Sequence, residues 1–176
     1  AAADRSRGAY GDMADAVAKM GLLAKDAFRS NDELIAFTEL VQKSFKVAGA
    51  DTSAQQAAMR QLSQAMASGR LQGDELVSIM ENAPMIYEAI AKYMGKTKAE
   101  LKELSSEGAI TSDIIKNAMF AAADNINKKF QKMPITFGDV WNKIKNSATQ
   151  AFGGVMQRIN KLINTEGFQE FLDKMV

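Results

Sequence analysis

The sequence contains no cysteine and no histidine among its 176 residues. Disulfides, thiol nucleophiles, histidine general bases and the usual transition-metal sites are therefore excluded. Carboxylates, lysines and tyrosines remain as side chains that could act in catalysis. The absence of cysteine also fits a protein that functions whatever the redox compartment.

Proline is scarce too, with 2 residues, and long apolar runs are missing. No stretch approaches the ~18–20 apolar residues that a membrane-spanning helix needs, and no apolar segment follows the first arginines as a signal peptide requires. Hydrophobic residues make up 47% of the chain and charged residues 24%, which is sufficient for one domain with a real core. From the abrupt ends we expect a fragment of a longer chain.

Basic residues are unevenly distributed, although the formal net charge is only +1. Residues 124–161 hold seven lysines and arginines against Asp124 and Asp139, a local net charge of +5. Such a segment could lie against nucleic acid, an acidic wall or anionic lipid, or it could be an ordinary solvated helix face. The candidate interaction surface consists of Lys128, Lys129, Lys132, Lys143, Lys145, Arg158 and Lys161.

Apolar residues recur at helical spacing along most of the chain, and strand signals are scarce. One stripe, from Ile115 to Phe130, predicts a single longer helix that Pro134 follows. The pattern predicts an all-α fold of about six to eight helices with short loops, and most of the methionines lie on the apolar stripes. Residues suited to helix ends separate the stripes: Gly49, Asp51, Asp74, Pro84, Gly95, Thr97 with Glu100 as a capping box, and Thr111 or Ser112.

The last long helix, expected from Thr136 onward, has a seam of mixed three- and four-residue spacings that resembles a coiled-coil edge. Gly153 and Gly154 interrupt this seam and predict a kink. The helix either packs on the bundle, with Trp141 as its anchor, or leaves the bundle and continues into a rod. The seam residues are Val140, Ile144, Ala148, Ala151, Val155, Ile159 and Leu162.

A weak internal repeat aligns "SGRLQGDELVSIM" (68–80) with "EGAITSDIIKNAM" (107–119). In each copy a glycine allows the positive φ that ends one helix, and an aspartate stands at the start of the next. We predict that the apolar residues between them meet in a short bridge, as in a paired EF-hand. The structural turn residues are Gly69, Leu71, Asp74, Gly108, Ile110 and Asp113.

Neither loop has the ligands that calcium needs. An EF-hand requires oxygen ligands early in the loop and a glutamate at position 12. The first loop places Met66 at a ligand position, and the second places Ile114 at position 12. We therefore predict structural turns without metal, and we expect no cofactor and no small-molecule substrate.

Enzymatic interpretations find little support in the sequence. Asp74 and Glu75 are successive residues that point to different parts of a helix surface, so they do not face one cleft as an acid/base pair must. The Gly153–Gly154 pair lacks the lysine and hydroxyl residue of a phosphate loop. A cell-wall hydrolase using a Glu/Asp pair remains as an alternative, but no carboxylate has a distinctive setting for it. We predict that the chain is not an enzyme.

Several long stretches together resemble a known family. They are "QLSQAMASGRLQGDELVSIMENAPMIYEAIAKYMG", "TKAELKELSSEGAITSDIIKNAM" and "KKFQKMPITFGDVWNKIKNSATQAFG". The chain is similar, over roughly residues 10–155, to the tape measure domain near the N-terminal part of phage tail tape measure proteins.

This resemblance implies a structural protein of the phage tail. Members of the family are long helical chains whose length sets the length of the tail. They lie in the lumen of the tail tube, with assembly in the bacterial host cytoplasm, and they leave the tube when DNA is ejected. The resemblance implies tail tube, tail tip and tail assembly chaperone proteins as partners.

We predict a globular helical domain over residues 1–133, followed over 134–176 by a long C-terminal helix and a short terminal helix. The long helix is the predicted start of an extended rod and a candidate region for self-association. The alternative function is a module that contacts membrane or DNA weakly during genome delivery, with the basic segment 124–161 as its surface.

Overall fold

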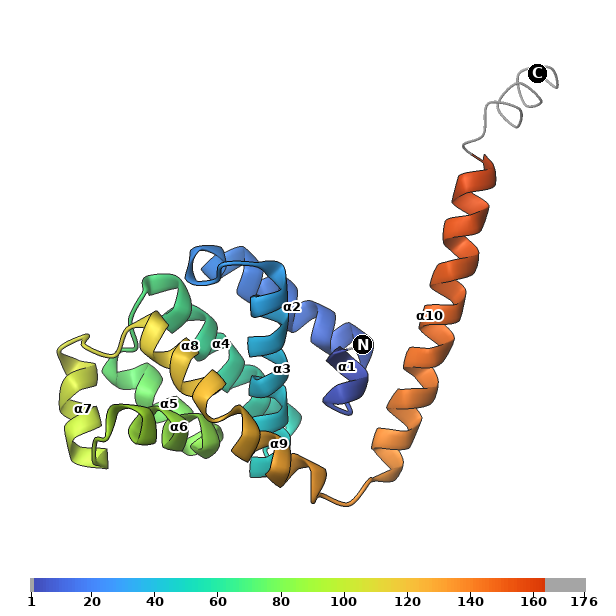
Figure 1. Ribbon diagram of the computed structural model, residues 1–176. Helices are drawn as coiled ribbons and strands as arrows, with labels where there is room; N and C mark the ends of the chain where they lie inside the picture. The colour runs from blue at the N-terminus through green and yellow to red at the C-terminus, as the bar shows by residue number, and fades with distance from the viewer. Residues whose placement is uncertain (1, 164–176) are drawn as a thin grey trace.

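The computed structural model describes residues 2–163, and within this range the chain folds into ten α-helices and one 3-10 helix (Figure 1). The predicted all-α fold is confirmed. The elements are α1 Ala2–Arg5, α2 Tyr10–Ala24, the 3-10 helix η1 Lys25–Ala27, α3 Asn31–Ala48, α4 Thr52–Ser68, α5 Gly73–Asn82, α6 Pro84–Met94, α7 Lys98–Ser106, α8 Ser112–Ala121, α9 Ala123–Gln131 and α10 Phe137–Ile163.

Most helix ends lie where the sequence predicts them, because the signals are local. Asp51 and Thr111 cap α4 and α8 by accepting hydrogen bonds from backbone amides. Thr97 and Glu100 form the predicted capping box of α7, and the Thr97 amide lowers the pKa of Glu100 to about 2. Pro84 opens α6. Left-handed glycines end three helices, at Gly49, Gly69 and Gly95.

The ten helices among residues 2–163 exceed the predicted six to eight for two reasons. α1 has only 4 residues, too few to show a helical period. In addition, the single helix predicted from Ile115 to Phe130 is divided at Ala122 into α8 and α9. α8 packs mainly against α6 and also contacts α3, whereas α9 packs mainly against α3. Tertiary packing therefore divides a segment that contains neither glycine nor proline.

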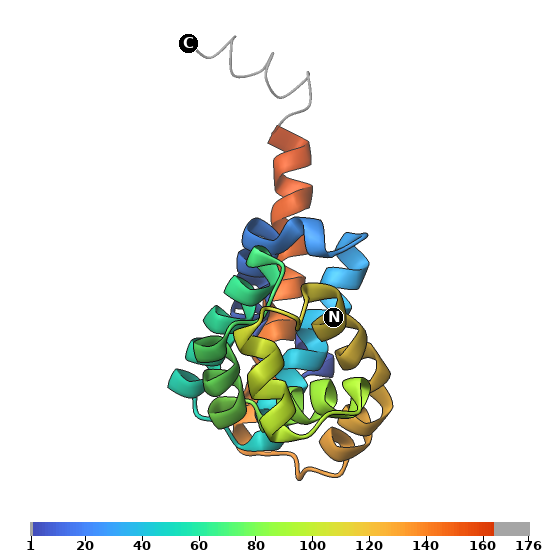
Figure 2. The ribbon, with the colours of Figure 1, turned by 90° about the vertical axis from the view of Figure 1, so that its left-hand side faces the viewer.

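α3 lies at the centre of the bundle and contacts α2, α6, α8 and α9 (Figures 1 and 2). Its Phe37 and Phe45 are fully buried. The ring of Phe37 lies 5.3 Å from that of Phe28 and 6.4 Å from that of Phe120, measured between centroids. Burial of these rings and of the surrounding aliphatic side chains is the main stabilising term of the bundle.

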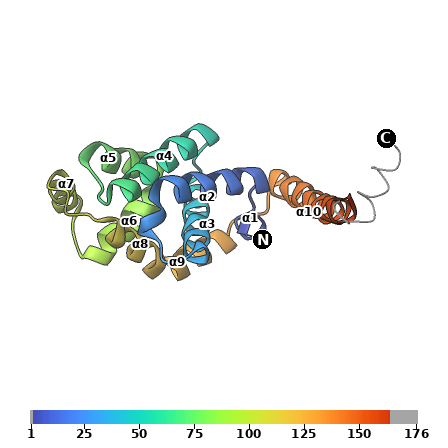
Figure 3. The ribbon, with the colours of Figure 1, turned by 90° about the horizontal axis from the view of Figure 1, so that it is seen from above.

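α10 stands apart from the other helices. It runs along the edge of the bundle beside α1 and extends past it (Figures 1 and 2), and from above it lies at one end of the molecule (Figure 3). The helix is uninterrupted at Gly153 and Gly154, because a glycine lowers helix propensity but does not by itself end a helix. The kink predicted there stays a prediction. The predicted short terminal helix lies outside the described residues.

Candidate assembly surface

The two loops of the internal repeat lie side by side. The Leu71 amide donates to the Ile110 carbonyl at 2.7 Å, and the Ser112 amide donates to the Gly69 carbonyl at 2.9 Å. The two backbones form a short antiparallel bridge here. Leu71 and Ile110 are fully buried. The loops thus join α4 and α5 to α7 and α8, which gives them a packing role.

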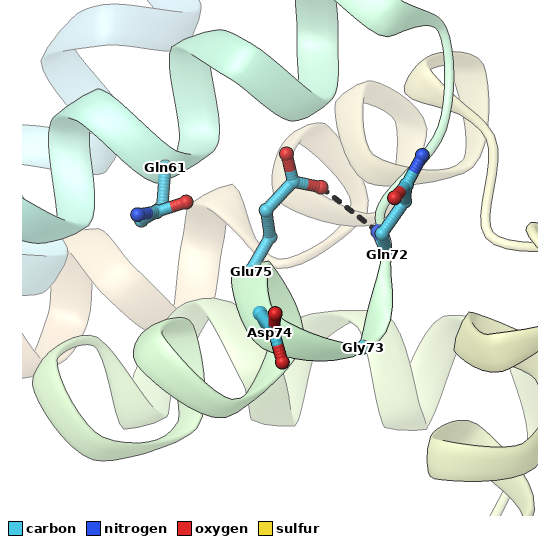
Figure 4. A pocket seen from close by; sticks show the side chains of 5 residues that line it. All are labelled: Gln61, Gln72, Gly73, Asp74 and Glu75. Carbon is cyan, nitrogen blue, oxygen red and sulfur yellow. Dashed lines mark hydrogen bonds between the residues drawn. The ribbon is translucent and has the colours of Figure 1, made fainter.

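The start of α5 differs from the prediction. α5 begins at Gly73, and its N-cap is Gln72 rather than Asp74. The Gln72 amide donates to the Glu75 carboxylate at 2.8 Å (Figure 4). Asp74 and its counterpart Asp113 are the second residues of α5 and α8, in the first turn, where a negative charge is favoured by the helix dipole.

An open pocket lies beside this cap, between α4 and the start of α5 (Figure 4). Glu75 is turned toward the Gln72 amide, and the side chain of Asp74 points in another direction. An acid/base pair needs two groups directed at one reacting bond, which this arrangement does not provide. Among the described residues there is no group of three or more acidic side chains that could hold a metal ion. The pocket residues are Gln61, Gln72, Gly73, Asp74 and Glu75.

The predicted basic surface is divided between two helices that diverge from each other (Figure 1). On α10, Lys143 and Lys145 point about 200° apart around the helix axis. On α9, Lys129 lies 3.9 Å from Glu88. The lysines therefore do not form one continuous face, and their role in binding stays a prediction. The exposed members are Lys128, Lys129, Lys132, Lys143 and Lys145, and the side chains of Arg158 and Lys161 fall outside the described part.

The bundle holds α10 through polar contacts that the sequence did not indicate. Asn146 is 2% exposed, and its side-chain amide donates to the Asp4 carboxylate and to the Gly8 carbonyl, both at 2.9 Å. Near the start of α10, Asp139 forms an ion pair with Lys46 of α3 at 2.8 Å. We call Asp4, Lys46, Asp139 and Asn146 the α10 joint.

Both acidic groups of the α10 joint have a pKa below the ordinary value. Burial raises the pKa of Asp139, but hydrogen bonds from Lys46 and from the Thr136 amide lower it by more. The hydrogen bond from Asn146 is the main cause that lowers the pKa of Asp4. Both carboxylates are therefore ionised at neutral pH. Lys46 and Asp139 are 93 residues apart, so no local pattern could have paired them.

An ionic cluster around the buried Glu39 lies next to the α10 joint. Glu39 of α3 is 7% exposed and pairs with Arg5 at 2.7 Å and with Lys43 at 2.8 Å. Lys43 also donates to the side chain of Asn127 at 2.8 Å. Burial raises the pKa of Glu39, but hydrogen bonds from Arg5 and Lys43 lower it by more, so that it lies below its ordinary value. The cluster ties α1, α3 and α9 together.

α10 turns its polar side toward the bundle and its apolar side toward solvent. Asp139, Asn142 and Asn146 contact the bundle from one side of the helix. The opposite side is exposed, including Trp141, which is 52% exposed and therefore does not anchor α10 as the sequence predicted. We call this exposed side the α10 stripe; it consists of Phe137, Val140, Trp141, Ile144, Ala148, Ala151 and Phe152.

The orientation of the α10 stripe reverses the usual arrangement, in which a surface helix buries its apolar side against the core. Contiguous exposed apolar surface marks sites of interaction with other molecules. The sequence indicated the apolar seam but not the side to which it faces. The α10 stripe is the candidate assembly surface of the described residues.

Comparison with known protein families identifies the family of the chain. The family model described as tape measure protein matches residues 1–157. The chain belongs to the tape measure protein family. The resemblance seen in the sequence is thereby confirmed. Tape measure proteins are structural components of phage tails that determine tail length. No curated protein and no solved structure matches the chain.

The match covers the whole bundle of this tape measure protein and continues into α10 as far as residue 157. The α10 joint and the α10 stripe both lie within it. As a component of the virion tail, the tape measure protein interacts with other tail proteins. Within the described residues, no helix combines the length and the apolarity needed to cross a membrane.

Proposed function

We propose that this chain is the globular module of a tape measure protein and that the extended helical part of the protein begins at α10. The observation that carries the proposal is the course of α10, which leaves the bundle with its apolar side exposed inside the region matched by the family. A helix advances about 1.5 Å per residue, so a chain that continues in this way converts its length directly into distance.

In this proposal the module reaches the lumen of the tail tube after assembly in the host cytoplasm. It acts through protein–protein contacts with tail tube, tail tip and tail assembly chaperone proteins, and it leaves the tube during DNA ejection. Two kinds of exposed surface support such contacts. The α10 stripe suits apolar partner surfaces, and the lysines on α9 suit acidic ones.

Tail length tests the proposal directly. An insertion of 18 helix-forming residues after Gln150 adds five turns, which keeps both sides of α10 in phase. In phage that carries this insertion in the complete tape measure protein, electron microscopy should show tails about 27 Å longer than wild type. The matched control is a flexible insertion of the same length in the turn between α6 and α7, which should leave tail length unchanged. Normal tails of unchanged length in the α10 variant would contradict the proposal.

A second candidate function is contact with DNA or with an anionic membrane during genome delivery. It is favoured by the exposed lysines Lys128, Lys129 and Lys132 at the end of α9. A DNA shift assay and flotation with anionic vesicles, each titrated with salt, distinguish the two partners. Binding that weakens as salt rises supports this function, and the absence of binding at low salt excludes it.

A further inference from the structure

Arg7 has a backbone conformation that residues with a side chain rarely adopt. Its φ is +55°, and within residues 2–163 it is the only residue other than glycine with a positive φ. It ends α1 in a Schellman motif, in which the Gly8 amide donates to the Ala3 carbonyl at 2.9 Å. Arg7 occupies the position of this motif that is usually glycine. The other left-handed positions in the described range are Gly49, Gly69, Gly95 and Gly108.

The left-handed conformation at position 7 is unfavourable, because the Cβ of any residue but glycine lies too close to the backbone there. A glycine is present in the sequence, but one position later, at Gly8. Unfavourable backbone conformations persist only where the surrounding contacts determine them, and they are frequent at functional and switch regions. The contacts of Arg7 therefore indicate what a side chain does at this position.

The Arg7 guanidinium holds the turn that leads into α10. Its carbon Cζ lies 4.6 Å from the centroid of the Phe130 ring, within the range of a cation–π interaction. Its Nη1 donates to the Met133 carbonyl at 3.1 Å and to the Pro134 carbonyl at 3.4 Å. The side chain of Arg7 thus fixes the end of α9 and the following turn, residues 132–136, to the end of α1.

The backbone carbonyl of Arg7 contacts α10 itself. It accepts a hydrogen bond from Nζ of Lys46 at 2.5 Å and one from Nδ2 of Asn142 at 3.5 Å. Lys46 also forms the ion pair with Asp139 of α10. The backbone conformation of Arg7 determines how the chain turns after α1, and with it the position of this carbonyl. One residue therefore contacts both the turn before α10 and the first part of α10.

α1 gives Arg7 a fixed base on the bundle. Ala3 and Ser6 are each 1% exposed, and Arg5 pairs with Glu39 of α3. Among the described helices, α10 has its main contact with α1 (Figure 1). The direction of α10 therefore depends on the end of α1 and on the turn that Arg7 holds, because no apolar packing fixes it.

We propose that Arg7 is the positioning residue that fixes the direction of α10 relative to the bundle. A glycine at this position would remove the backbone strain but would leave the turn 132–136 without its anchor. The inference goes beyond the proposed function, on which it rests only for the role of α10 as the start of the rod. The direction of α10 in the isolated chain and the tail length in phage are measured separately, so either result can fail without the other.

Arg7→Gly separates the direction of α10 from the stability of the bundle. Glycine adopts the left-handed conformation without strain, so the melting temperature, followed by circular dichroism, should not fall below that of wild type. The chain has no cysteine, so spin labels can be placed at Lys19→Cys on α2 and Thr149→Cys on α10, in labelled chains diluted with unlabelled protein. Their distance distribution should become about twofold broader in Arg7→Gly, because the turn 132–136 loses its anchor.

Arg7→Lys and Arg60→Gln complete the test. Lysine keeps a charge near the Phe130 ring but lacks the planar guanidinium that reaches two carbonyls, so the distribution should have an intermediate width. This variant also tests the role of Arg7 if Arg7→Gly does not fold. Arg60 is exposed on α4, so Arg60→Gln removes an equal charge and should keep the wild-type distribution. Distributions as narrow as wild type in both Arg7 variants would overturn the proposal, as would equal broadening in Arg60→Gln.

Discussion

Gly69 and Gly108 hold the left-handed backbone conformation at the paired loops, with φ of +80° and +69°. A side chain in this conformation costs about 1 kcal/mol or slightly more. The added Cβ at position 108 would also lie 3.0 Å from the side chain of Arg70, which is exposed and can move aside. The two glycines are therefore needed for their backbone freedom more than for space.

We expect Gly69→Ala and Gly108→Ala each to lower the free energy of unfolding by about 1 kcal/mol because of this conformational cost. Urea denaturation followed by circular dichroism measures the change. Gly73→Ala is the control, since Gly73 lies in the first turn of α5 without a positive φ and without close neighbours. An equal loss in the control would show that the left-handed conformation is not the cause.

Glu39 makes the stability of the bundle depend on pH. Its pKa in the folded chain lies below the ordinary 4.5, because Arg5 and Lys43 outweigh the effect of burial. The stabilisation that ionised Glu39 gives the folded chain is thus fully present above pH 4.5, and it is lost as the pH falls through the folded-state pKa of Glu39.

We expect Glu39→Gln to lower the free energy of unfolding at pH 7 by about 2 kcal/mol, since it leaves the buried Lys43 without its anion, whereas the exposed Arg5 can turn to solvent. The difference from wild type should shrink as the pH is lowered below 4.5. Urea titrations at several pH values measure both effects. Glu103→Gln, at an exposed position of α7, should change stability little. A Glu39→Gln effect that is constant with pH would contradict the ionic explanation.

At the scale of elements, α10 shows that an amphipathic helix need not bury its apolar side within its own chain. Its attachment depends on a few polar contacts, chiefly those of Asn146 and Asp139. A single hydrogen bond contributes only about 0.5–1.5 kcal/mol of net free energy, and here these few contacts stand in place of the apolar burial that holds the other helices. The direction of α10 is therefore easier to change than the packing of the bundle.

We expect Asn146→Ala to widen the range of α10 orientations, because it removes hydrogen bonds to Asp4 and Gly8. Spin labels at Lys19→Cys on α2 and Thr149→Cys on α10 report the distance between the helices, in labelled chains diluted with unlabelled protein. The distance distribution should broaden in Asn146→Ala while the melting temperature changes little.

The control for the α10 joint is Ser147→Ala. The hydroxyl of Ser147 donates to the Lys143 carbonyl of its own helix, so its loss should leave the distance distribution as in wild type. Equally narrow distributions in Asn146→Ala and wild type would show that Asn146 does not fix the direction of α10.

At the scale of the whole molecule, the bundle contains its own core. The apolar core cluster extends from Ala16 to Ile126, and α10 adds no residue to it among those described. This arrangement supports the prediction that residues 1–133 are a domain that folds without the long helix, a proposal that truncation can test.

We expect a chain ending at Met133 to unfold cooperatively and to have a radius of gyration of about 14 Å, the value for a compact chain of this length. Small-angle X-ray scattering should give a larger value for the full chain, because α10 adds a helix about 40 Å long at the edge of the bundle. An unfolded or aggregated truncated chain would contradict the domain boundary, as would proteolysis of the full chain that leaves no stable product ending near Met133.

Much of the fold could be derived from the sequence because its signals are local. Helix ends are set by residues within one turn of them, such as Pro84, Thr97 with Glu100, and the helix-ending glycines. The apolar stripes need only a regular spacing. The lack of cysteine and histidine excluded whole classes of chemistry, and the long stretches resembling tape measure proteins indicated the family.

Only the tertiary structure decided what covers each helix. A stripe shows which side of a helix is apolar, but the side that meets the bundle depends on groups distant in the chain, such as Asp4 and Asn146, 142 residues apart. The same is true of the division of one predicted helix at Ala122, which follows from the separate surfaces that α8 and α9 cover. Periodicity is a property of a segment, whereas the direction of the α10 stripe is a property of the whole fold.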